Sequence, residues 1–199
     1  MLNFQLSPEQ LKLQKKARKF ALKEILPVAW YYDEIDETPL PVLKKAYESG
    51  LMNGGIPKKY GGSGWGLIEA VVLTEEFSAA CPGLATSIFD NSLGMEPLLL
   101  SKNEPLKKKY FAKILNAFKL ICFATSEPTM GSDVAGIRCK AERDGDDYIL
   151  NGTKFWITNG GLADYMSIFA TVDPDASTRP TRGAIASAVA PTASRRRAG

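Results

Sequence analysis

The sequence predicts an α+β fold, with an all-helical N-terminal domain followed by an incomplete antiparallel β-domain. Apolar residues return at helical spacing up to about residue 118, and short β-prone runs replace that pattern from about residue 119. After Phe169 the sequence holds no further aromatic residue, and residues 175–199 are rich in Ala, Ser, Thr, Pro and Arg. We therefore expect a helical domain at 1–118, a partial β-domain at 119–174 and a divergent, disordered tail at 175–199.

The first helix has a clear start signal close to the N-terminus. Ser7 is placed to cap the helix, Pro8 suits the first helical position, and Gln10 completes a capping box. Apolar residues then return at roughly helical spacing until Pro27, where we expect an interruption.

Further helices are predicted downstream by amphipathic spacing, at residues 42–49, 67–80, 84–100 and 103–116. In the helix at 67–80 the expected buried face comprises Ile68, Val71, Val72, Glu75 and Phe77. The lysine run Lys107–Lys109 is interpreted as a solvated helix face, because Leu106, Tyr110 and Ile114 lie opposite it.

Strand signals begin with the apolar run 120–124 and continue at 138–143 and 165–172. The strongest of them is Tyr148–Ile157, where two β-prone runs flank Asn151-Gly152. Asn-Gly is the pair favoured for a type I′ turn, so we expect a hairpin to turn at these two residues.

Composition excludes several kinds of chemistry. The chain has no histidine, which rules out Ser-His-Asp and Cys-His nucleophile systems and imidazole-ligated metals. Any chemistry must therefore rest on a carboxylate or on a cofactor. The three cysteines are scattered and lack C-x-x-C spacing, so neither a disulfide scaffold nor a zinc site is expected. A net charge of +3, with no long apolar run, predicts neither nucleic-acid nor membrane binding.

Two segments carry candidate ligand-binding chemistry. In Cys122–Asp133 a short strand ends in hydroxyl residues and a turn follows, whose backbone amides and Ser132 can bind an anion. In Asn151–Gly161, Trp156 offers a flat ring for stacking and Thr158 a nearby hydroxyl. A flat aromatic cofactor with a phosphate tail suits this set. Composition alone leaves open the alternative of a strand-end turn and a core tryptophan.

The two segments resemble the flavin-contacting signatures of the acyl-CoA dehydrogenase family, approximately aromatic-x-x-T-E-P-x-x-G-S-D and N-G-x-K-x-W-I-T-N-G. Other segments fit the family in the same order, from about residue 5 to about residue 174: 50–52, 56–57, 60–62, 75–77, 91–94 and 107–110. The likeness is greatest to the straight-chain and medium-chain members.

The resemblance implies an FAD site. The residues that match flavin-binding positions are Phe123, Ala124, Thr125, Ser126, Gly131, Ser132, Trp156, Ile157 and Thr158. Ser132 also matches a position beside the thioester end of the acyl-CoA substrate. Glu127 lies inside the first signature, and its matched role is structural.

The resemblance further implies α,β-dehydrogenation of an acyl-CoA to a trans-2-enoyl-CoA, in fatty-acid or amino-acid catabolism. In the family the catalytic glutamate lies in a C-terminal four-helix domain, which we expect to be absent here. No glutamate follows Glu142, so no catalytic residue is assigned. Family members pass electrons to an electron-transferring flavoprotein and form homotetramers. We expect a cytoplasmic protein, or a mitochondrial-matrix protein if a transit peptide is missing.

Three interpretations stay open at this stage. In the first, the chain is the truncated product of an acyl-CoA dehydrogenase gene and is inactive alone. In the second, it is a non-catalytic fragment of a split enzyme, which binds flavin or acyl-CoA or contacts another subunit. In the third, its arginine-rich tail binds nucleic acid or anionic lipid. The third is weakened by the lack of aromatic residues between the arginines.

Overall fold

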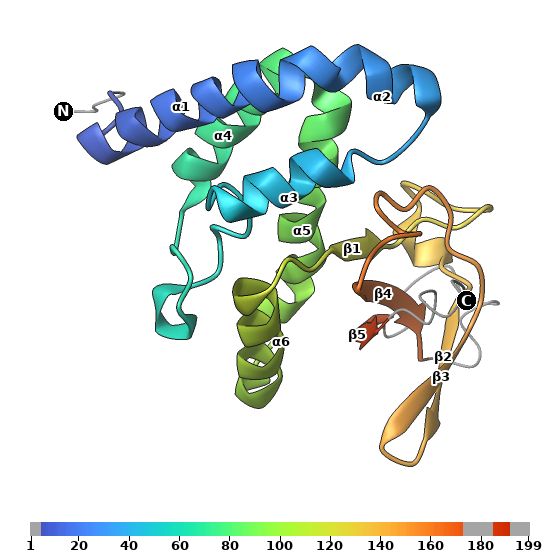
Figure 1. The fold of residues 1–199 in the computed structure, drawn as a ribbon. Coiled ribbons are helices and arrows are strands. Elements are labelled where there is room, and N and C mark those ends of the chain that lie inside the picture. Colours follow the sequence, from blue (N-terminus) through green and yellow to red (C-terminus); the bar gives the residue numbers. More distant parts are fainter. Residues whose placement is uncertain (1–4, 173–184, 192–199) are drawn as a thin grey trace, which may run out of the picture. The chain divides into compact units, whose positions relative to one another are not determined.

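The computed structural model describes residues 5–172 and 185–191, the last seven by their backbone (Figure 1). Its chain divides into two compact units. A helical unit holds the residues up to Ser92 together with Ser101–Phe118, and a second unit holds Leu93–Leu100 together with the residues from Lys119 onward. Helices followed by a small sheet confirm the predicted α+β class.

The N-terminal helix forms as predicted and then changes its type rather than ending. In α1 (Pro8–Phe20) the Ser7 hydroxyl accepts from the Gln10 amide at 3.2 Å, and the Gln10 side chain accepts from the Ser7 amide at 2.9 Å. The chain continues through a π-helical turn and a 3₁₀ turn that contains Pro27. Proline has no N–H to donate, so the regular hydrogen-bond ladder cannot pass through it. These elements lead into a further helix: η1 (Ala21–Ile25), η2 (Leu26–Val28) and α2 (Ala29–Ile35).

The remaining predicted helices are present with nearly the predicted limits: α3 (Leu40–Glu48), α4 (Leu67–Ala80), α5 (Pro82–Leu100) and α6 (Glu104–Asn116), with the short η3 (Lys58–Tyr60) between α3 and α4. Aromatic contacts link three of the helices through Phe77 on α4. Its ring lies 5.4 Å from the Phe20 ring and 5.5 Å from the Phe89 ring, centroid to centroid. Phe77 is fully buried and therefore lies at the centre of this core.

The buried side of α4 differs from the predicted set, of which three members are exposed: Ile68, Val71 and Glu75. Val72 and Phe77 are buried as predicted, and Glu76 is buried beside them. The Arg18 guanidinium donates two hydrogen bonds to the Glu76 carboxylate, at 2.7 and 2.8 Å. A buried carboxylate is tolerated there because a bidentate partner satisfies both of its oxygens.

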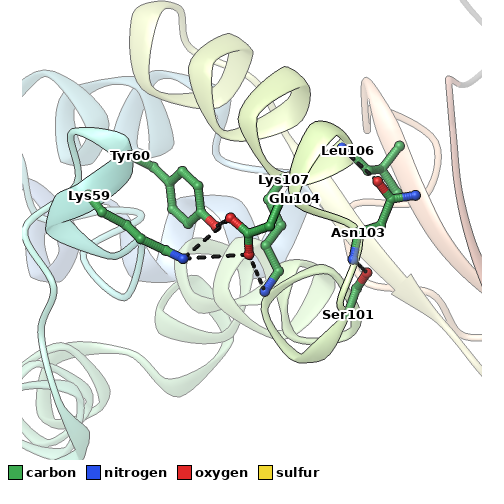
Figure 2. A network of polar contacts seen from close by, with 7 residues as sticks. All are labelled: Lys59, Tyr60, Ser101, Asn103, Glu104, Leu106 and Lys107. Atoms are coloured by element: carbon green, nitrogen blue, oxygen red, sulfur yellow. Dashed lines mark hydrogen bonds and ion pairs between the residues drawn. The ribbon is translucent and has the colours of Figure 1, made fainter.

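A polar network fixes η3 to the start of α6 (Figure 2). The Glu104 carboxylate accepts from the Tyr60 hydroxyl at 2.5 Å and pairs with Lys59 at 3.3 Å and Lys107 at 3.7 Å. Asn103 caps α6 by accepting from the Leu106 amide at 3.0 Å. The side chain of Lys107 is only 12% exposed, so the predicted solvated lysine face is wrong for this residue.

The second unit contains a mixed sheet rather than the purely antiparallel one expected. Its strands are β1 (Ile121–Ala124), β2 (Lys140–Asp144), β3 (Asp147–Asn151), β4 (Tyr165–Thr171) and β5 (Ile185–Pro191), and η4 (Val134–Gly136) lies between β1 and β2. The order is β1-β4-β2-β3, and β5 pairs with β4. β1 runs parallel to β4, whereas the β2/β3 and β4/β5 pairs are antiparallel.

β5 lies within the segment 175–199, for which the sequence predicted disorder, so that prediction is wrong over 185–191. The strand is ordered by its ladder along β4, which joins Ile185 to Thr171 at one end and Pro191 to Tyr165 at the other. Backbone pairing of this kind needs no large side chains. The rest of the predicted tail lies outside the described residues.

The predicted hairpin is present one strand earlier than expected. β2 and β3 turn at Gly145-Asp146, where Gly145 adopts φ 59°. Asn151-Gly152 instead ends β3, and a Cβ on Gly152 would lie only 2.7 Å from the Cys139 Cα. Gly145-Asp146 is also a pair that favours a two-residue hairpin turn, with Gly at the first central position, and strand pairing uses this earlier signal.

Candidate flavin site

The first signature begins inside the sheet. Phe123 and Ala124 belong to β1, and Ala124 is fully buried. The Phe123 ring packs against Phe169 of β4, with 4.7 Å between ring centroids. The parallel pairing of β1 with β4 therefore holds this end of the signature.

Immediately after β1, Thr125 presents a polar atom with no partner. Its Oγ1 is buried and makes no hydrogen bond. A buried hydroxyl without a partner costs roughly 1–3 kcal/mol, so such an atom indicates a missing ligand or a strained site. The backbone around it is well fixed, because the Ser126 carbonyl accepts from the Phe155 amide at 2.9 Å.

An ion pair between Lys154 and Glu127 joins the two signatures next to Thr125. The Lys154 ammonium donates to the Thr125 carbonyl and to Glu127 Oε1, both at 2.9 Å. Glu127 also accepts from the backbone amides of Arg138 at 2.8 Å and Cys139 at 2.9 Å. Burial by itself raises the pKa of Glu127, but these bonds outweigh it and hold the pKa below its ordinary value. Glu127 is thus a structural carboxylate, in the role that the resemblance gave it.

The second signature leaves the sheet and exposes its tryptophan. Trp156 adopts φ 57° and is 85% exposed, which is unusual for a residue with so large an apolar ring. Its indole lies edge-on to Phe155, at 4.7 Å between centroids. Ile157 and Thr158 follow and are half-buried. The alternative of a core tryptophan is therefore wrong.

Gly131 and Ser132 follow a tight turn that begins at Glu127. Glu127 and Met130 close this turn with reciprocal backbone hydrogen bonds of 3.0 and 3.1 Å. Gly131 and Ser132 are exposed, and a Cβ on Gly131 would meet no atom within 4 Å. The structure thus brings the residues after β1 together with the segment 154–155, and Gly131 and Ser132 lie exposed just after the turn.

The donor set suits a flat aromatic ligand with hydrogen-bonding edges. The orphaned Thr125 hydroxyl offers a hydrogen bond, and Trp156 offers an exposed ring for stacking. In the described part of the chain, no cluster of three or more His, Cys, Asp or Glu side chains is placed to hold a metal ion. The helices of that same part are also too short or too polar to span a membrane. These features make the end of β1 and the segment that follows β3 a candidate site for an organic cofactor.

Comparison with known proteins identifies the family. The acyl-CoA dehydrogenase N-terminal domain matches residues 7–117, and the acyl-CoA dehydrogenase middle domain matches residues 122–197. The chain belongs to the acyl-CoA dehydrogenase family. The middle-domain match extends past residue 174, where the likeness was expected to end.

Individual relatives agree with this assignment. A probable medium-chain specific acyl-CoA dehydrogenase, mitochondrial, from Caenorhabditis briggsae is 38% identical over 89% of this chain and 43% of its own length. A glutaryl-CoA dehydrogenase solved with glutaryl-CoA has a TM-score of 0.84 at 34% identity, over 96% of this chain and 48% of that one. A Mycobacterium smegmatis glutaryl-CoA dehydrogenase in complex with FADH2 has a TM-score of 0.82 at 28% identity, over 94% and 46%. The chain spans about half the length of these relatives.

Sequence reasoning missed two polar residues. Lys154 is the first, although a lysine between β-prone residues in the second signature was a signal that it has a buried partner. Asp90 on α5 is the second; it is only 6% exposed and its Oδ2 has no hydrogen-bond partner. Burial raises the pKa of Asp90 from 3.8 to about 7. No local pattern marks Asp90, because only the packing of the helical unit removes it from water.

Proposed function

We propose that this chain forms the flavin-holding part of an FAD-dependent acyl-CoA dehydrogenase, an oxidoreductase that converts acyl-CoA to trans-2-enoyl-CoA. The observation that carries the proposal is the buried, unpartnered Thr125 hydroxyl at the end of β1, beside a backbone fixed by the second signature. Relatives solved with FADH2 and with glutaryl-CoA support the same cofactor and substrate class.

In this proposal the chain's own residues bind and orient the cofactor. Thr125 and Ser126 hold the edge of the flavin ring through hydroxyl and backbone groups, and Trp156 with Thr158 covers it from the second signature. The nine residues that match family positions, including Gly131 and Ser132 for the pyrophosphate and thioester ends, stay a prediction. When bound, FAD supplies the hydride acceptor for the β-carbon of the acyl group.

Partners follow from the same proposal. We infer an acyl-CoA as substrate and an electron-transferring flavoprotein as electron acceptor. The chain is similar to a solved structure from work on the electron transferring flavoprotein of Acidaminococcus fermentans, with a TM-score of 0.86 at 28% identity. A homotetramer is proposed from the family alone.

The test measures the binding of FAD to the chain by titration of FAD fluorescence. Replacing the orphaned hydroxyl in Thr125→Val should weaken FAD binding by roughly threefold to tenfold, the equivalent of about one hydrogen bond. Thr74→Val is the matched control, because its exposed hydroxyl bonds only the Ala70 carbonyl of its own helix. If FAD does not bind the wild-type chain, or if both variants bind it equally, the proposed site is wrong.

A second function is binding without dehydrogenation. It is favoured by the candidate site itself, where the buried Glu127 carboxylate is engaged by the Lys154 ammonium and by the Arg138 and Cys139 amides instead of being held free to take a proton. Adding a medium-chain acyl-CoA to the FAD-loaded chain separates the two. Bleaching of the visible flavin absorbance means that the chain or a co-purifying partner removes the α-proton, and an unchanged spectrum favours the binding function.

A further inference from the structure

Lys154 makes an unusual set of contacts for a lysine. Its side chain is only 12% exposed, and its ammonium is shared between a backbone carbonyl and a carboxylate that is itself 4% exposed. Taking two charges out of water costs several kcal/mol per ion, and an apolar pair of similar volume is often no less stable. Stability alone therefore gives a weak reason for an ion pair at this place.

The contact with Thr125 gives a stronger reason. Lys154 bonds the carbonyl of the same residue whose hydroxyl is buried without a partner. The next residue of each segment adds a second tie, from the Phe155 amide to the Ser126 carbonyl. Two consecutive carbonyls are thus held from one side, which fixes the peptide plane between Thr125 and Ser126 and leaves the hydroxyl for a ligand.

Glu127 has a structural role that differs from that of Lys154. Both of its oxygens accept backbone amides, from Arg138 and Cys139, so it would hold the turn after β1 even without the lysine. It also fixes the position of the ammonium through Oε1. Of the two members of the ion pair, Lys154 is the one whose hydrogen bond reaches Thr125.

We infer that Lys154 is a positioning residue of the flavin site, which orients Thr125 for the cofactor through its bond to the Thr125 carbonyl. This inference rests on the proposed function. It assigns to Lys154 an effect on cofactor affinity and on the spectrum of the bound flavin, besides any effect on stability.

The single variant Lys154→Met leaves the Glu127 carboxylate buried without its counter-ion, so it risks unfolding for that reason alone. The informative pair is Glu127→Gln and the double variant Glu127→Gln/Lys154→Met. Both lack the buried carboxylate, and they differ in the Lys154 ammonium, which carries the tie to Thr125. Glu127→Gln leaves that ammonium without its counter-ion, so the melting temperature of each apo-protein is measured beside its affinity. Lys154→Arg keeps a cation that can donate to the same carbonyl.

The experiment measures the dissociation constant of FAD by fluorescence titration, the visible spectrum of bound FAD and the apo-protein melting temperature for all four proteins. We expect Glu127→Gln and Lys154→Arg to bind FAD within about threefold of wild type. The double variant should bind it at least about tenfold more weakly, because a charged hydrogen bond is lost, and its bound flavin should show a changed band shape.

Equal affinity in Glu127→Gln and the double variant would overturn the inference while leaving the proposed function intact. The same holds if the affinity loss in the double variant merely follows a lower melting temperature and Lys154→Arg, which keeps a cation at this place, binds FAD as weakly as the double variant. If the wild-type chain does not bind FAD, both the proposed function and this inference fail.

Discussion

Replacing Asp90 by asparagine should make the helical unit more stable at neutral and alkaline pH. Asp90 lies on α5, is almost fully buried and has one oxygen without a hydrogen-bond partner. Burial disfavours the charged form and raises its pKa from 3.8 to about 7. The folded chain therefore keeps a proton on Asp90 between about pH 4 and pH 7 that the unfolded chain has lost. Stability contributed by the neutral form is complete below pH 4 and is lost as pH rises to about 7.

The magnitude follows from the two pKa values. At about 1.4 kcal/mol per pH unit, the interval from 3.8 to about 7 corresponds to at most about 4 kcal/mol. Roughly 2.5 kcal/mol of this falls between pH 5 and pH 8. Asparagine has nearly the same shape as aspartic acid and does not ionise. The stability of Asp90→Asn should therefore not fall between pH 5 and pH 8 through titration at this position.

The assay is urea unfolding followed by circular dichroism of the helices, for wild type and Asp90→Asn at pH 5, 6, 7 and 8. The difference in free energy of unfolding between the two proteins should grow in favour of the variant by about 2–3 kcal/mol from pH 5 to pH 8. Asp33→Asn serves as control, because Asp33 is exposed, and its difference should stay constant. A pH-independent difference for Asp90→Asn would refute the argument from burial.

Two further predictions concern packing and are measured by urea unfolding. Gly94→Ala should destabilise the second unit by about 1–3 kcal/mol, because the new Cβ would lie 2.9 Å from the Ile121 carbonyl oxygen. Gly131→Ala is its control and should leave the urea midpoint unchanged, because the new Cβ would meet no atom within 4 Å. Phe77→Ala should cost the helical unit about 3–5 kcal/mol, since Phe77 is fully buried, whereas Val71→Ala on the exposed side of the same helix should change it by about 0.5 kcal/mol or less. Similar losses in both members of either pair would contradict the packing described.

Much of the fold could be predicted because its signals are local. The capping box joins Ser7 to Gln10, three residues apart, and both of its hydrogen bonds are present. The apolar spacing of the later helices likewise acts over three or four residues. The prediction failed for part of α4, where Glu76 is buried because of Arg18, a residue 58 positions away.

The candidate site shows the same division between features set by local sequence and features set by distant contacts. The two signatures are sequence patterns, so the order of residues along the chain is enough to indicate the family and the candidate residues. The strand limits around the second signature do not follow from that order, since Gly145-Asp146 and Asn151-Gly152 both favour a turn and only the pairing of β3 with β2 shows which of them forms the hairpin.

The sequence by itself determined the helices, the change to strands near residue 119 and the two signatures, because each depends on neighbours along the chain. Only the tertiary structure decided that Trp156 is exposed, that Thr125 keeps a buried hydroxyl without a partner, and that Lys154 ties the signatures together. The last contact spans 29 residues and the ion pair with Glu127 spans 27. Contacts at that separation follow from how strands pair and loops cross, which no local propensity specifies.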